Sequence, residues 1–167
     1  MKLTADFDLS EFIPEGAPSR DIPAMVIENL LDLATTLLQP ARDALGVAIR
    51  IGSGWRPADK NAAVGGASAS DHLEGRAADL QADALAERTW EEMTFELFDW
   101  LRVHRMGFFG QLILEDHREA LEKPEKLWVH VSLRTAKHPG LADPNLVLVS
   151  NAPKQYRPWM PEHEALA

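Results

Sequence analysis

Two stretches of the chain carry apolar residues at the spacing of an amphipathic helix. The first set recurs at intervals of three and four positions: Ile27, Leu30, Leu31, Ala34, Leu37 and Leu38. The second set follows the capping-box pair Thr89 and Glu92: Trp90, Met93, Leu97, Phe98 and Leu101. This periodicity predicts helices over 23–38 and 89–104. Pro40 is expected to interrupt or kink the first, with the helical pattern continuing after it until Gly46. We expect these two helices to be the main core elements.

Four shorter stretches have the composition of strands. Residues 47–51, 111–115 and 127–133 are rich in aliphatic residues, and the charged connection between the last two favours an antiparallel pair. Residues 77–81 are compatible with a strand, although the spacing alone leaves a helix open. A short helix is also expected after Pro57, ending at the neighbouring Gly-Gly pair.

The two ends of the chain are less regular. Residues 1–22 mix polar side chains with prolines, and we expect a surface arm whose Phe7, Leu9 and Phe12 pack against the core. Residues 137–167 hold five of the eleven prolines, which predicts an irregular tail. The predicted fold is a single α+β domain over 1–167. Its antiparallel sheet is built from strands near 47–51, 77–81, 111–115 and 127–133, packed on the helices near 23–38 and 89–104.

Charge and composition exclude several classes of protein. The net charge of -9 is unsuited to a nucleic-acid-binding surface, so no nucleic-acid partner is expected. No apolar run approaches the length of a membrane span. The N-terminal residues include acidic side chains where a signal peptide needs an apolar segment, so we expect synthesis in the cytoplasm without a signal peptide.

Histidine and aspartate give the strongest chemical signal. His72 and Asp79 lie seven positions apart after a Gly-Gly turn, and His130 lies in the apolar run LWVHVS. Because the chain has no cysteine, a transition metal would have to use histidine and carboxylate ligands. Two histidines and one aspartate are a usual ligand set for catalytic zinc, since they leave a fourth coordination position for water. Each histidine alone is more often an ordinary surface or hydrogen-bonded core residue. The other four are interpreted as surface residues: His104, His117, His138 and His163.

The segment from Ser53 to Leu80, SGWRPADKNAAVGGASASDHLEGRAADL, together with QLILE and WVHVS, resembles a known zinc peptidase family. This family contains D-alanyl-D-alanine carboxypeptidases, vancomycin-resistance dipeptidases and phage L-alanyl-D-glutamate endopeptidases, which share the Hedgehog/DD-peptidase fold. The likeness runs from about Phe7 to Ser132 and is strongest to the compact phage and prophage branch. The motifs that carry it are SGWR, VGG, S-x-H-x-x-G-x-A-x-D and WVH.

Position by position, the resemblance implies roles for five residues. His72, Asp79 and His130 would bind zinc in a cleft on the sheet. Arg56 would contact the substrate or the developing oxyanion, because a guanidinium stays charged and can hold an oxyanion through two parallel hydrogen bonds. Ser70, in the S-x-H position, would help to shape the substrate site.

The general base departs from the family pattern. Many members place a Glu or Asp three residues before the last zinc histidine, but this chain has Leu127 there. We predict Glu115 instead, because antiparallel pairing of 111–115 with 127–133 would place Glu115 opposite Leu127 or Trp128. A carboxylate opposite Trp128 would share a face with His130. The alternatives are Glu122, Glu125 and Asp71, with Asp116 and His117 also near in sequence.

The resemblance implies a zinc metallopeptidase that hydrolyses a peptide bond in bacterial peptidoglycan stem or cross-link peptides. It would act as a monomer on the cell wall, after release from the cell or as part of a virion. A carboxypeptidase and an endopeptidase remain open, as do a lysis enzyme, a tail component and a host remodelling enzyme. The alternative from another class is a non-catalytic, metal-stabilised module for cell-wall binding or virion assembly, which the missing acid before His130 keeps open.

Overall fold

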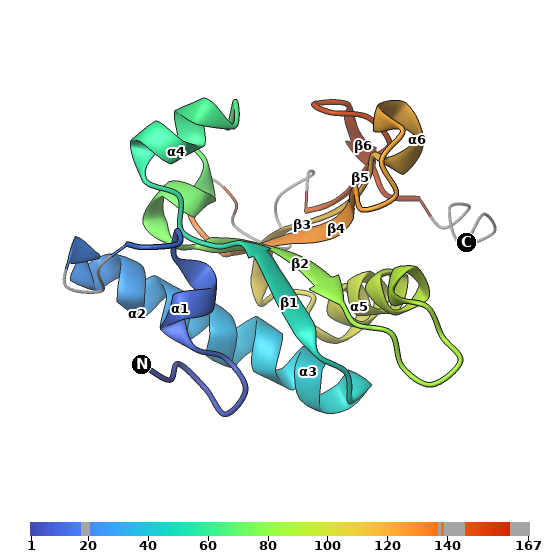
Figure 1. Ribbon diagram of the computed structural model, residues 1–167, viewed down its shortest axis with the longest axis horizontal. Helices are drawn as coiled ribbons and strands as arrows, with labels where there is room; N and C mark the ends of the chain where they lie inside the picture. Colours follow the sequence, from blue (N-terminus) through green and yellow to red (C-terminus); the bar gives the residue numbers. More distant parts are fainter. Residues whose placement is uncertain (18–20, 137, 139–145, 161–167) are drawn as a thin grey trace.

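A six-stranded, mostly antiparallel sheet forms the middle of the molecule, with strand order β1-β2-β4-β3-β5-β6 (Figure 1). The computed structural model describes residues 1–17, 21–136, 138 and 146–160. Its strands are β1 Ile49–Ser53, β2 Ala77–Ala82, β3 Phe109–Asp116, β4 Leu127–Leu133, β5 Val147–Ser150 and β6 Tyr156–Pro158. Its helices are α1 Leu9–Phe12, α2 Ala24–Leu33, the π-helical segment η2 Ala34–Leu38, α3 Gln39–Leu45, α4 Ala58–Ala63, the 3-10 turn η3 Asp71–Glu74, α5 Trp90–His104 and α6 Arg118–Leu121. The predicted α+β domain is confirmed.

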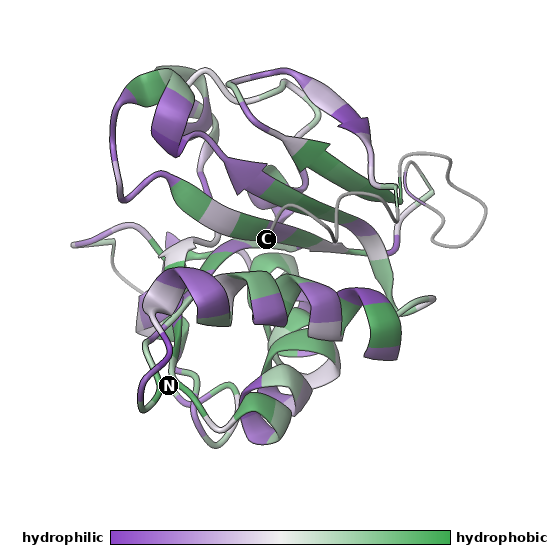
Figure 2. Cartoon of the chain, turned by 90° about the vertical axis from the view of Figure 1, so that its right-hand side faces the viewer, coloured by the Kyte–Doolittle hydropathy of each residue, from purple (hydrophilic) through white to green (hydrophobic). Residues whose placement is uncertain are grey.

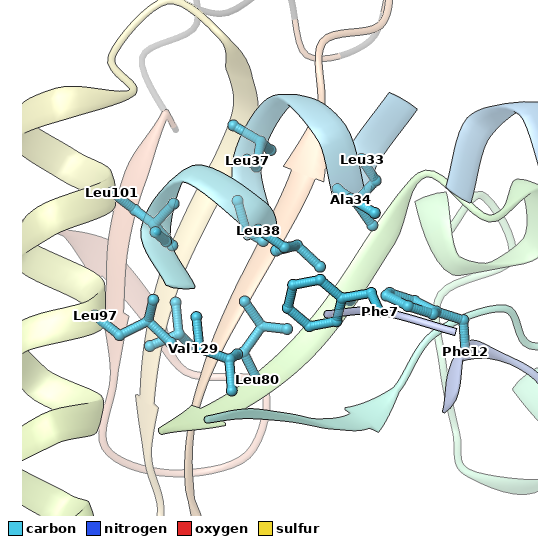
Figure 3. Close-up of a cluster of buried hydrophobic side chains, with 14 of the residues drawn as sticks. Phe7, Phe12, Leu33, Ala34, Leu37, Leu38, Leu80, Leu97, Leu101 and Val129 are labelled. Carbon is cyan, nitrogen blue, oxygen red and sulfur yellow. The ribbon is translucent and has the colours of Figure 1, made fainter. Parts of the chain in front are cut away.

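The two long helical segments cover one face of the sheet and bury the main core. Strand residues that point toward these helices are apolar, including Leu80 on β2 and Val129 on β4, and both are fully buried. They meet Leu97 and Leu101 of α5 and the leucines of η2 (Figure 3). Along the helices beneath the sheet, hydrophobic and hydrophilic stretches alternate (Figure 2), as expected for elements with one buried face.

Pro40 changes the first long helix without ending it. Proline has no backbone N–H, so a regular α-helical hydrogen bond cannot form at this position. The residues just before it, Ala34–Leu38, widen into a π-helical turn in which the N–H of Gln39 donates to the carbonyl of Ala34. The helix then continues as α3 to Leu45. The expected interruption or kink is a local widening, the expected continuation to Gly46 is confirmed, and Leu37 and Leu38 stay buried.

The N-terminal segment packs into the core as expected. Phe7, Leu9 and Phe12 are all nearly fully buried, and the rings of Phe7 and Phe12 contact each other edge to face. The backbone of Phe12 also passes directly over Gly54 at the end of β1, where an added Cβ would lie 2.5 Å from the Phe12 carbonyl oxygen. Glycine is required at position 54 because two backbone segments touch there.

The prediction of an irregular tail is wrong for two of its segments. Residues 147–150 form β5, which pairs in parallel with β3, and residues 156–158 form β6, which pairs antiparallel with β5. The sheet is therefore larger than the four predicted strands, and one of its pairings is parallel. The tail residues 137, 139–145 and 161–167, which include His163, lie outside the described residues.

The remaining boundaries shift by a few residues. The predicted strand at 47–51 lies at 49–53, and the one at 111–115 extends over 109–116. The uncertain segment 77–81 is a strand. Within the part of the chain that the structure describes, no helix has the length and apolar character needed to cross a membrane.

Candidate metal centre and cleft

Adjacent strands present two of the expected metal ligands side by side. Asp79 on β2 pairs directly with His130 on β4 in the antiparallel register. Directly opposed residues of antiparallel strands project from the same face of the sheet, which here is the face away from the core helices. Both residues therefore point to the opposite side from their buried neighbours Leu80 and Val129.

The third residue, His72, arrives from the 3-10 turn η3. Its ring is 1% exposed, and its Nδ1 lies 2.6 Å from the carbonyl oxygen of Gly54. Because a carbonyl only accepts, Nδ1 carries the hydrogen and Nε2 is left with a free lone pair. The turn itself is fixed by Trp55, whose indole N–H donates to the carbonyl of Leu73. A backbone carbonyl that orients the ring in this way is common at metal-binding histidines.

The three side chains converge closely enough to hold one ion. Nε2 of His72 lies 3.2 Å from Nδ1 of His130 and 3.3 Å from Oδ1 of Asp79, and the last two atoms are 2.9 Å apart. Zinc ligands at about 2.0–2.1 Å in a tetrahedron lie about 3.3 Å from one another. The donor atoms therefore fit a zinc ion with little adjustment. Among the described residues, these three form the group of histidine and acidic side chains able to bind a metal ion.

Electrostatics keep Asp79 ionised. Burial alone would raise its pKa, but the interactions of the carboxylate with the imidazoles of His72 and His130 bring the pKa well below its usual range. An ionised carboxylate beside two imidazoles is the charge state that a divalent cation needs from its ligands.

Glu115 lies beside the three candidate ligands. It pairs with Trp128 across β3 and β4, which is one of the two expected registers, and so shares the open face with His130. The residue is 8% exposed, and burial raises its pKa to about 7, opposed by the charge of His130 and by a hydrogen bond with Trp128. A carboxylate with a pKa near neutrality can both take up and release a proton at working pH.

The alternative bases are less well placed. Glu122 and Glu125 are exposed on the connection between α6 and β4 and are absent from the cleft lining. Asp116 is held by Arg118 at 2.7 Å. Asp71 does line the cleft, next to His72 in sequence. The assignment of Glu115 as base stays a prediction, and its position supports it.

Arg56 and Ser70 both line the same cleft. The backbone N–H of Arg56 donates to the carbonyl of His72, which ties the SGWR segment to η3. The buried Nε of its guanidinium has no hydrogen-bond partner among the described groups, and the residue lines the cleft. Ser70 is the residue immediately before η3.

The Gly-Gly turn before Ser70 is held by a buried asparagine. Asn61 on α4 is 3% exposed, and its side-chain N–H donates to the carbonyl of Ala67 at 2.9 Å. A Cβ on Gly66 would overlap the side-chain amide of Asn61, so a larger residue at this position would displace Asn61. The VGG motif thus positions the chain that leads into His72.

Residues from the chain after β3 also line the cleft. His117, interpreted from sequence as a surface residue, is in fact 3% exposed and lines the cleft. Its Nε2 lies 2.9 Å from Oγ of the buried Ser150 on β5 and 3.6 Å from Oε2 of Glu115. His138 also lines the cleft, whereas His104 is exposed as expected. The hairpin of β5 and β6 adds Lys154 and Tyr156.

Together these residues enclose a cleft of about 930 Å³ on the open face of the sheet. One wall is the turn after α4, the floor is the sheet with the three candidate ligands, and the other wall is the β5–β6 hairpin. A His-Asp-His centre at the base of a cleft, with a neighbouring carboxylate and an unpaired arginine, defines a mononuclear metallohydrolase type of site.

Comparison with known proteins gives the family. The model for the family Peptidase M15 matches residues 14–110, more than half of the chain. The chain belongs to this family of zinc metallopeptidases. The matched region includes His72, Asp79 and Arg56, and it ends before Glu115 and His130. A search of curated proteins found no match.

Proposed function

We propose that this protein is a zinc peptidase that hydrolyses a peptide bond in the stem or cross-link peptides of bacterial peptidoglycan. The observation that carries the proposal is the convergence of His72, Asp79 and His130 beside Glu115 at the base of one cleft. Membership in the M15 family supports the zinc peptidase chemistry. The likeness of the SGWR and WVH segments to cell-wall peptidases supports the substrate class.

His72, Asp79 and His130 would hold the zinc ion. When bound, zinc supplies a Lewis acid that polarises the scissile carbonyl and lowers the pKa of water. Glu115 takes a proton from the attacking water as its oxygen bonds to the carbonyl carbon, and passes this proton to the leaving nitrogen when the C–N bond breaks. Arg56 donates hydrogen bonds to the charge that develops on the carbonyl oxygen or to a substrate carboxylate. The products are a carboxylic acid and an amine, which transfer a proton at neutral pH to become a carboxylate and an ammonium group.

The proposal extends to the setting in which the enzyme works. We place it in the compact phage and prophage branch of the family, acting on the cell wall after release from the cell or as part of a virion. Both a carboxypeptidase and an endopeptidase are compatible with an open cleft, and the masses of the released muropeptides distinguish them.

The test is digestion of purified peptidoglycan by the zinc-loaded protein. We expect muropeptide products that disappear with a chelator and return with zinc. Glu115→Gln should lower kcat by about 10²- to 10⁴-fold, because it removes the general base and keeps the shape of the side chain. The matched control is Glu125→Gln, an exposed residue away from the cleft, which should leave kcat unchanged. Stoichiometric zinc without any released product would favour the non-catalytic cell-wall module instead.

A further inference from the structure

The turn between β5 and β6 reaches across the cleft. In Figure 1 this turn leans over the face of the sheet toward the α4 side. The ammonium nitrogen of Lys154 lies 3.8 Å from the position that a Cβ on Gly65 would occupy, on the turn after α4. Residues nearly ninety positions apart in sequence therefore meet across the open side of the cleft. The side chain of Lys154 spans its mouth.

Hydrogen bonds hold this turn in one backbone conformation. Lys154 has a φ of 63°, in the left-handed region that residues other than glycine seldom adopt. The turn is held by hydrogen bonds from the Ser150 hydroxyl and the Gln155 N–H to the carbonyl of Ala152. A further bond joins Arg157 to the side chain of Asn151. Backbone strain of this kind persists where the surroundings enforce it, and it often marks a ligand-contacting segment.

The charge of Lys154 is not neutralised within the described part of the protein. No carboxylate of a described residue forms an ion pair with Lys154, Arg56 or Lys126, although all three line the cleft. This is unexpected in a chain with 26 acidic and 17 basic residues. The cleft is therefore lined by three cations without a carboxylate partner, alongside the carboxylates of Asp71, Asp79 and Glu115. Because the ammonium group of Lys154 lies at the mouth, beside Gly65, it is a local binding point for an anionic group of a ligand.

The inner side of the hairpin faces the reaction centre. Tyr156, two residues after Lys154, lines the cleft with half of its surface exposed. Burial, together with the charges of Glu115 and Asp79, raises the pKa of the Tyr156 phenol, so this ring lies within their electrostatic reach. A ligand reaching from the candidate metal centre to the cleft mouth would pass Tyr156 and meet Lys154.

We propose that Lys154 is a specificity-determining residue that binds a free carboxylate of the peptide substrate at the cleft mouth, remote from the carbonyl under attack. This inference rests on the proposed peptidase function and adds the feature of the substrate that the hairpin recognises. Lysine suits the role because its ammonium group is a compact charge on a flexible stem, able to follow a carboxylate on a mobile peptide. In this proposal Arg56 contacts the reacting end of the substrate, and Lys154 binds a carboxylate at the distant end.

The experiment measures binding separately from cleavage. Zinc-loaded Glu115→Gln protein is titrated calorimetrically with a stem pentapeptide ending in D-alanyl-D-alanine, and with analogues in which each free carboxylate in turn is converted to an amide. We expect one amide analogue to bind about five- to tenfold more weakly than the free acid, the scale of one solvent-accessible charge-assisted hydrogen bond.

Lys154→Asn in the same background should remove this discrimination by weakening the free acid alone. Asparagine tolerates a positive φ, so the turn should keep its shape. Lys154→Arg should restore much of the discrimination. The control is Lys123→Asn, which neutralises an exposed lysine outside the cleft lining and should retain it.

Equal affinity of the acid and amide peptides, or discrimination that survives Lys154→Asn, would overturn the inference and leave the peptidase proposal standing. If the protein with Glu115 intact cleaves no peptidoglycan and the Glu115→Gln protein binds none of the peptides, the proposed function fails together with the inference.

Discussion

The carboxyl group of Glu115 is buried, and its burial should make the free energy of unfolding depend on pH. Its pKa in the folded protein is raised from 4.5 to about 7, chiefly by burial. Between these two pH values the folded state retains a proton that the unfolded state has lost. The free energy of unfolding of the metal-free protein should therefore fall as the pH rises from 4.5 through 7.

Glu115→Gln removes this titration. In the metal-free state the variant should become more stable than the parent as the pH rises, by up to about 3 kcal/mol near pH 8, because the parent then buries a charge. Near pH 4 the difference should largely disappear. Urea unfolding with a chelator, measured across this pH range, gives the result. A pH-independent difference between the two proteins would contradict the proposed burial of an ionisable Glu115.

Ser150 connects the C-terminal strand β5 to the cleft through one hydroxyl group. Its Oγ accepts from His117 and donates to the carbonyl of Ala152, and the residue is 1% exposed. Ser150→Ala would leave a buried imidazole N–H without this partner, which should cost about 1–3 kcal/mol of stability. The control is Ser68→Ala at an exposed position, expected to change stability by less than about 0.5 kcal/mol. Equal denaturation midpoints for the two variants would show that the His117 contact contributes nothing.

At the scale of elements, the turn after α4 controls how the chain approaches His72. Gly66→Ala would push its Cβ into the side chain of Asn61 and break the bond from Asn61 to Ala67. We expect a stability loss of about 1–3 kcal/mol and a fall in peptidoglycan hydrolysis by the folded fraction.

The matched control is Gly52→Ala on β1. A Cβ there would lie 3.5 Å from the carbonyl of Asp79, an ordinary contact, so stability should change little. Thermal unfolding and cleavage assays of both variants provide the test. Unchanged stability and activity in Gly66→Ala would mean that the turn is not fixed by Asn61.

Elements with strong local patterns were predictable from sequence. The helix beginning after Thr89 carries both the capping box and the apolar period, and it forms as expected. The short strand β5 was missed because its stability comes from a parallel partner, β3, more than thirty residues earlier. A run of four apolar residues in a proline-rich tail gives no local sign of such a pairing.

At the scale of the whole molecule, the fold brings together site residues that are far apart in the sequence. The sequence allowed His72, Asp79 and His130 to be predicted as candidate ligands, and the structure brings their donor atoms within 4.8 Å of one another. The placement of Glu115 followed from strand pairing. His117 was recognised as near Glu115 in sequence but was interpreted as a surface residue, because its charged surroundings give no sign of its burial. Lys154 and Tyr156 could not be predicted, because they reach the cleft only when the C-terminal hairpin joins the sheet. Their local sequence resembles an ordinary surface.

The central claim is that two histidines and one aspartate, brought together by η3, β2 and β4, hold a single zinc ion. X-ray absorption of the zinc-loaded protein tests it most directly. The structure predicts one tetrahedral zinc per chain with two imidazole nitrogens at about 2.0–2.1 Å and carboxylate and water oxygens at about 2.0–2.2 Å. A spectrum without imidazole scattering, or an unchanged spectrum and zinc content in His130→Ala, would contradict the account.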